Sequence, residues 1–245
     1  MLKKRIVISL TFNDGILFRT KNFKADYRYT KNFLDLWSID ELVLIDVSRE
    51  KFKKSFIDII KFFSKNCFVP IAVGGGIKNI NDADCYFGSG ADKIILSPKI
   101  SENPDTLIEI SKKYGNQSII QSIDFLKKNN NYYLCSNSGQ DVLREKPDRW
   151  ATRALELGAG EILLNDVDND GSLLGYDYKF IRDIALKLNC PVLALGGCGN
   201  WDHILQLFSF TSVSAACTQN IYHFTNESIK SAKNYLKLNN VNIRK

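Results

Sequence analysis

Two aspartates that follow apolar runs have the residue type needed for acid and base catalysis. Asp124 and Asp170 each follow an apolar run that ends in polar residues. Two carboxylates can divide proton donation and acceptance when their surroundings push their pKa values apart. A structural interpretation stays open, in which Asp170-Gly171 is a turn and Asp124 caps the next helix. The catalytic hypothesis predicts that the two carboxylates face each other across one site, from opposite halves of the fold.

Two glycine pairs directly follow apolar runs and suggest phosphate binding. Gly75-Gly76 comes after Pro70-Ile-Ala-Val, and Gly196-Gly197 comes after Pro191-Val-Leu-Ala-Leu. Glycines after a strand let backbone N–H groups approach a phosphate. Tight turns alone would also need glycine, but the matched positions favour a ligand with a phosphate at each end. We expect the phosphate contacts at Gly76, Gly171, Gly196 and Gly197.

A second group of charged residues stands at or beside the starts of apolar runs. These residues are Arg5, Glu41, Lys93 and Glu161. Two cations and two anions in these positions predict a closed ring of salt bridges at the opposite end of the fold. Charges at that end of a parallel barrel ordinarily serve stability.

The elements that must position these residues form a repeating pattern of strands and helices. Short runs rich in Val, Ile and Leu alternate with helical patterns, which is typical of parallel strands covered by helices. The segment 52–63 has apolar residues at 52, 56, 59, 60 and 63, on one face of a helix. We expect eight strands, near residues 5–11, 42–46, 69–73, 92–96, 118–124, 161–166, 191–195 and 212–217.

An internal repeat indicates how these strands close. Asp46 is followed after 24 residues by Pro70 and its glycines, and Asp168 is followed after 23 residues by Pro191 and its glycines. A doubly wound open sheet does not require equivalent segments about 120 residues apart. We therefore predict one domain over residues 1–245, a (β/α)8 TIM barrel built from two half barrels. Its reacting groups would lie at the C-terminal ends of the strands.

Composition excludes several classes of function. The 245 residues include 33 Lys and Arg against 27 Asp and Glu, a net charge of +6. These basic residues are scattered, so we expect no nucleic-acid partner. Six cysteines without a C-x-x-C pair and only two histidines argue against a metal site, and we expect no cofactor. No apolar run is long enough for a signal peptide or a membrane span, which predicts a cytoplasmic protein with reduced thiols.

Several segments together resemble the cyclase subunit of imidazole glycerol phosphate synthase, and the likeness runs through the whole chain. They are Pro70–Ile77, Gly90–Lys93, Gly158–Leu164, Asp168–Gly171, Gly175–Asp177 and Val241–Arg244. The resemblance implies a (β/α)8 barrel that receives ammonia from a separate, HisH-like glutaminase subunit docked at the barrel bottom. It also implies that ammonia travels through the barrel core to the top.

The resemblance assigns a role to the charged residues at the barrel bottom. The family's ammonia gate of one Arg, two Glu and one Lys falls on Arg5, Glu41, Glu161 and Lys93, and its partner-docking Asp falls on Asp92. All four gate positions match by residue type. This favours a gate over a ring that serves stability alone.

At the top, the resemblance is poorer. The family's first catalytic Asp falls on Thr11 and a nearby Lys on Arg19, while Asp124 and Asp170 match. An Asn-Thr pair becomes Ser97-Pro98, and Pro98 has no N–H for a phosphate. At the other phosphate site, a Ser before the glycines becomes Leu195, and a small Ala-Ser pair becomes Gln219-Asn220. We expect a strong anion site at Gly171, Gly196 and Gly197, and a weak one at Ser97.

The segments Leu17–Thr20 and Asn22–Lys24 look like a divergent branch of this family, which is associated with amidation of surface-glycan sugars. Our leading hypothesis is therefore a barrel that channels ammonia from a glutaminase, together with a synthetase-like protein, for nitrogen transfer to a sugar. The alternative is the authentic cyclase of histidine biosynthesis, acting on a phosphorylated small molecule. A third hypothesis is a non-catalytic scaffold that activates the glutaminase.

Overall fold

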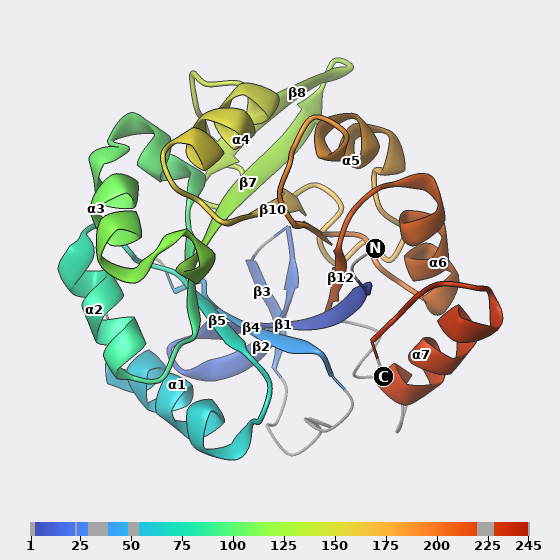
Figure 1. Ribbon diagram of the computed structural model, residues 1–245, viewed down its shortest axis with the longest axis horizontal. Coiled ribbons are helices and arrows are strands. Elements are labelled where there is room, and N and C mark those ends of the chain that lie inside the picture. The colour runs from blue at the N-terminus through green and yellow to red at the C-terminus, as the bar shows by residue number, and fades with distance from the viewer. Residues whose placement is uncertain (1–2, 23, 29–38, 49–53, 220–227, 245) are drawn as a thin grey trace.

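A computed structural model describes residues 3–22, 24–28, 39–48, 54–219 and 228–244. Eight parallel strands lie side by side, and each pairs with two neighbours, so that they close into a barrel (Figure 1). In spatial order they are β1 (Arg5–Asn13), β4 (Glu41–Asp46), β5 (Ile71–Gly74), β6 (Lys93–Leu96), β7 (Ile119–Lys128), β10 (Glu161–Asp166), β11 (Val192–Leu195) and β12 (Ala215–Thr218). The predicted (β/α)8 fold is confirmed.

Helices surround the barrel and connect successive strands, as Figure 1 shows. The helix α1 (Lys54–Asn66) buries Phe56, Ile59, Ile60 and Phe63, the face expected from the sequence, while position 52 lies outside the described residues. The other helices are α2 (Ile80–Gly88), α3 (Asp105–Tyr114), α4 (Pro147–Glu156), α5 (Tyr178–Ala185), α6 (Trp201–Phe210) and α7 (Ser228–Leu238), with short 3-10 turns η2 (Pro98–Glu102) and η3 (Asn116–Ser118). No helix in the described part of the chain has the length and apolar character needed to cross a membrane.

Two antiparallel extensions rise from the barrel strands and were not predicted from the sequence. The strands β2 (Ile16–Lys21) and β3 (Lys24–Arg28) continue β1, and β8 (Asn131–Ser136) and β9 (Asp141–Val142) continue β7. Positive φ angles at Asp14 and Gly15, and at Asn129 and Asn130, make two-residue turns. Asp-Gly is a strong signal for a two-residue turn, and Asn tolerates the positive φ that such a turn requires. These dipeptides were the signal that could have revealed the hairpins.

Alternation along the strands divides the apolar residues into an inner and an outer core. The inner core fills the barrel and includes Val7, Val43, Ile95, Ile120 and Leu163. Side chains at the intervening positions, such as Ile8, Leu44 and Ile94, pack outward against the helices. Trp150 is fully buried in this outer core and Trp201 packs against it. His203 has a structural contact, because its Nδ1 accepts a hydrogen bond from the Gly199 N–H. Trp37 and His223 lie outside the described residues.

The two halves of the barrel repeat one local geometry. A Cβ added at Gly75 would meet the Asp46 carbonyl oxygen at 2.5 Å, and a Cβ added at Gly196 would meet that of Asp166 at the same 2.5 Å. Both glycines also have positive φ, of 110° and 108°. The structural equivalent of Asp46 is therefore Asp166, the last residue of β10. The internal repeat in the sequence pairs Asp46 with Asp168 instead, which is wrong by two residues.

A buried ion pair ties the last helix to the barrel bottom. The Asp40 carboxylate accepts hydrogen bonds from Lys233 Nζ of α7 at 2.8 Å and from the backbone N–H of Ile6 at 2.8 Å. Both charged side chains are buried. Removing one partner of such a pair leaves a charge buried without compensation.

We expect Asp40→Ala to lower the free energy of unfolding by about 3–5 kcal/mol, measured by urea denaturation. The matched control is Asp84→Ala, since Asp84 pairs with Lys113 at the surface and such pairs contribute little. A change no larger for Asp40→Ala than for the control would contradict this assignment.

Candidate functional site

The four charged residues predicted at the barrel bottom begin β1, β4, β6 and β10 and point inward. We call Arg5, Glu41, Lys93 and Glu161 the floor cluster. Arg5 contacts Glu41 at 2.6 Å and Glu161 at 3.4 Å, and Lys93 contacts Glu161 at 2.5 Å. Among the described residues no ion pair joins Lys93 to Glu41, so the cluster is an open chain of contacts. The predicted closed ring is therefore wrong, since Glu41 is instead approached by Arg244 at 3.6 Å.

The floor cluster is largely shielded from solvent. Burial alone would lower the pKa of Arg5, but the charges of Glu161 and Glu41 outweigh burial and raise it. Burying such charges costs desolvation energy that apolar residues would not incur. Stability therefore does not account for four charges beneath an apolar interior. Asp92, next to Lys93, is exposed and accepts a hydrogen bond from the Ile71 N–H at 2.8 Å.

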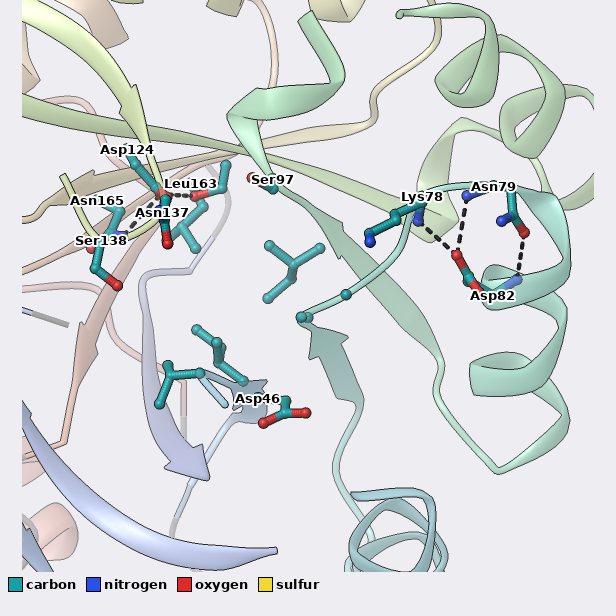
Figure 2. Close-up of a pocket in the computed structure, with 17 residues that line it drawn as sticks. Asp46, Lys78, Asn79, Asp82, Ser97, Asp124, Asn137, Ser138, Leu163 and Asn165 are labelled. Carbon is teal, nitrogen blue, oxygen red and sulfur yellow. Dashed lines mark hydrogen bonds between the residues drawn. The ribbon is translucent and has the colours of Figure 1, made fainter. Parts of the chain in front are cut away.

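At the other end of the barrel, the C-terminal ends of the strands surround a large pocket of about 460 Å³. Its lining comes from the ends of β4 to β7 and β10, and from the loop after β8. Figure 2 shows Asp124 and Asn165 on one side of this pocket and Lys78, before α2, on the other. Gly76, predicted as a phosphate ligand, also lines it. A volume of this size admits a small organic ligand.

Asp124 is the carboxylate that the barrel interior presents to the large pocket. Its Oδ1 accepts hydrogen bonds from Ser122 Oγ at 2.5 Å and Asn165 Nδ2 at 2.9 Å. Oδ2 has no hydrogen-bond partner among the described residues. Burial raises the pKa of Asp124, against the opposing effect of these two hydrogen bonds. A carboxyl group with a raised pKa and one available oxygen is suited to proton transfer with a bound ligand.

A small pocket lies beside the large one, over β1, β11 and β12. It is lined by the predicted residues Asp170, Gly171, Gly196 and Gly197, and by Thr11, Leu195 and Gln219. The space measures about 20 Å³, which is room for about one water molecule. The geometry therefore does not favour the predicted strong anion site at this end. The prediction that Asp124 and Asp170 face each other from opposite halves is wrong, because β7 and β10 are paired neighbours and the two residues line different pockets.

Side-chain hydrogen bonds close the small pocket at Thr11. The buried Thr11 hydroxyl donates to the Phe18 carbonyl oxygen at 2.7 Å and accepts from Gln219 Nε2 at 3.1 Å. Gln219 Nε2 also donates to the same carbonyl oxygen at 2.5 Å. Phe18 belongs to the unpredicted strand β2, so the hairpin itself supplies the acceptor. Thr11 is thereby fixed in a structural network and provides no carboxylate.

Sequence reasoning missed several polar residues around the two pockets. Ser122 and Asn165 lie next to apolar residues in strands, and Lys78 and Asp82 stand at a helix start. The alternation of inward positions along β7 and β10 could have identified Ser122 and Asn165. Asp166 was also missed, and burial raises its pKa to about 6, against opposing hydrogen bonds from Asn169.

The raised pKa of Asp166 predicts a pH-dependent stability. An unfolded Asp titrates near about 3.9, so between about pH 4 and pH 6 the folded state binds more protons than the unfolded state. The free energy of unfolding should therefore fall as pH rises through this window. Asp166→Asn removes this dependence. The free energy of unfolding of the variant, relative to that of the wild type, should rise by about 2–3 kcal/mol from about pH 4 to pH 7.

Urea denaturation of both proteins across that range measures the difference. Asp148→Asn, at an exposed carboxylate of α4, is the matched control. An equal pH trend in the two variants would show that burial of Asp166 is not its cause.

Comparisons with known proteins agree with this architecture. Residues 8–227 match the family model described as histidine biosynthesis protein. The chain is 34% identical to the imidazole glycerol phosphate synthase subunit HisF of Chlorobium chlorochromatii and to that of Hydrogenobaculum sp., and 33% identical to that of Clostridium botulinum. Each comparison covers the whole of both chains. The protein therefore belongs to the histidine biosynthesis protein family, as a HisF-like barrel.

Proposed function

We propose that this protein is the ammonia-using subunit of a glutaminase-coupled synthase. The floor cluster is the single observation that carries the proposal. Three buried charges and the half-buried Lys93 lie at the barrel bottom, beneath a layer of apolar side chains. Ammonia is small and neutral, so it crosses an apolar interior more readily than ammonium does. At the far end of that interior lie Asp124 and the large pocket. Ammonia enters at the floor cluster and reacts with an acceptor at the mouth.

The barrel bottom offers a surface for the glutaminase. Four exposed apolar residues lie at or just after the C-terminal ends of α1, α5, α6 and α7. The C-terminal ends of these helices all lie at the barrel bottom. These are Phe68, Leu186, Phe210 and Leu238, at 83%, 69%, 56% and 83% exposure. Apolar residues gathered on one face are typical of a protein interface. The exposed carboxylate of Asp92 adds a polar contact at the same end.

The acceptor of the nitrogen has two candidates. The names of the relatives favour cyclisation to imidazole glycerol phosphate, because the similarity extends over the whole chain. The mouth argues against that cyclisation, and the sequence segments Leu17–Thr20 and Asn22–Lys24 favour amidation of a surface-glycan sugar with a synthetase-like partner instead. Thr11 supplies no carboxylate, and the hydrogen bonds of Gln219 close the small pocket. We propose sugar amidation on these grounds and keep the cyclase as the alternative.

A cyclase assay distinguishes the two reactions. With free ammonia and the histidine-pathway ribonucleotide, turnover should be at least about a hundredfold below that of a HisF relative assayed in parallel. The reason is that loss of a positioned acid–base group costs about a hundredfold or more. The HisF of Chlorobium chlorochromatii is a suitable reference. Turnover equal to that of the reference would make the cyclase the function of this protein.

The floor cluster is tested by Lys93→Ala in the complex with the glutaminase. Loss of the contact between Lys93 and Glu161 should lower the amount of nitrogen transferred per glutamine hydrolysed, while the barrel stays folded. Lys99→Ala is the control, because Lys99 forms an exposed ion pair with Glu102 at the opposite end of the barrel. Unchanged coupling in Lys93→Ala would refute the assignment of the floor cluster as a gate.

A further inference from the structure

The two pockets at the barrel mouth differ greatly in the space that they enclose. The large pocket has about 460 Å³, and the small pocket about 20 Å³. A phosphate has five heavy atoms and needs several times the space of one water molecule. Leu195 and Gln219 occupy the small end, and Gln219 is held by two hydrogen bonds. Among the described residues, a ligand with a phosphate at each end therefore finds enclosed space for only one of them.

At the two helix starts beside the large pocket, several backbone N–H groups are occupied by the protein's own side chains. Asn79 Oδ1 accepts from the N–H groups of residues 81 and 82, at 3.0 and 3.1 Å. Asp82 Oδ2 accepts from those of residues 78 and 79, at 2.8 and 3.2 Å. At the start of η2, Ser97 Oγ accepts from the Lys99 N–H, and Pro98 has none to donate. Neither helix start therefore offers a full set of unoccupied N–H donors to a dianion.

The charges that line the large pocket are unequal in number and lie apart. Asp46, Asp82 and Asp124 contribute carboxylates, and Lys78 is the one cation among the described lining residues. Figure 2 shows the Lys78 side chain extending toward the pocket from the side opposite Asp124. Lys78 Nζ has no ion pair with a described residue. The pocket therefore offers one attachment point for an anion and several acceptors for hydroxyl groups.

From this arrangement we infer that the large pocket binds a hydroxylated, sugar-like ligand carrying one anionic group, with that anion at Lys78 and hydroxyl groups directed to Asp124. The inference rests on the proposed function only in naming this ligand as the ammonia acceptor. Binding itself requires neither the glutaminase nor ammonia. A charge-assisted hydrogen bond from Lys78 Nζ supplies the selectivity for the anion.

Titration calorimetry with three related probes tests the ligand class on the whole chain. Fructose 6-phosphate should bind, and fructose, which lacks the anion, should bind more weakly. Fructose 1,6-bisphosphate should bind no tighter than the monophosphate, because its second phosphate gains no site. Lys78→Met should weaken binding of the monophosphate about tenfold, and Lys78→Arg should restore most of it. Lys99→Met, which removes an exposed cation outside the pocket lining, is the matched control.

Three results would overturn the inference. They are bisphosphate binding at least about tenfold tighter than monophosphate binding, an unchanged affinity in Lys78→Met, or no measurable monophosphate binding at millimolar concentration. Equal thermal unfolding of Lys78→Met and wild type shows that the variant is folded. The calorimetry result is independent of the gate experiment. The inference about the ligand can be wrong while Lys93→Ala still uncouples glutamine hydrolysis from nitrogen transfer.

Discussion

Closure of the barrel by the pairing of β7 with β10 is the constraint on which the rest of the structure depends. Once the sheet has no edge, every second side chain of the eight strands must point into one enclosed interior. The position of an inward residue between the N-terminal and C-terminal ends of its strand then decides its surroundings. The first inward residues of β1, β4, β6 and β10 form the floor cluster, and later positions of the same strands fill the apolar core and the mouth.

This vertical order places three environments along one axis. Charges that pair with each other lie at the bottom, apolar side chains fill the middle, and Asp124 lies at the top. A neutral molecule can pass such an interior, whereas an ion would have to lose its hydration without compensation. The chemistry proposed for this protein follows from that order. It explains why a buried and costly set of charges stands where apolar residues would give greater stability.

The mouth shows how a repeated framework can hold an asymmetric site. Gly75 packs against Asp46 as Gly196 packs against Asp166, so the two half barrels have the same backbone at this level. Their loops differ, however. The β2–β3 hairpin supplies the Phe18 carbonyl oxygen that holds Thr11 and Gln219, and the small pocket closes on that side. The opposite half keeps an open pocket with Lys78 at its rim.

The sequence by itself determined the eight strands, the helical face of α1, the floor cluster and the place of Asp124 at the mouth. Each of these follows from local periodicity or from position relative to a strand end. Tertiary structure alone decided that the floor cluster is an open chain of contacts among the described residues, and that Arg244 from the C-terminal segment approaches Glu41. It also decided that Asp124 and Asp170 line different pockets and that Thr11 is tied to Gln219. These contacts join residues up to about two hundred positions apart, and side-chain volume in a closed barrel decides them.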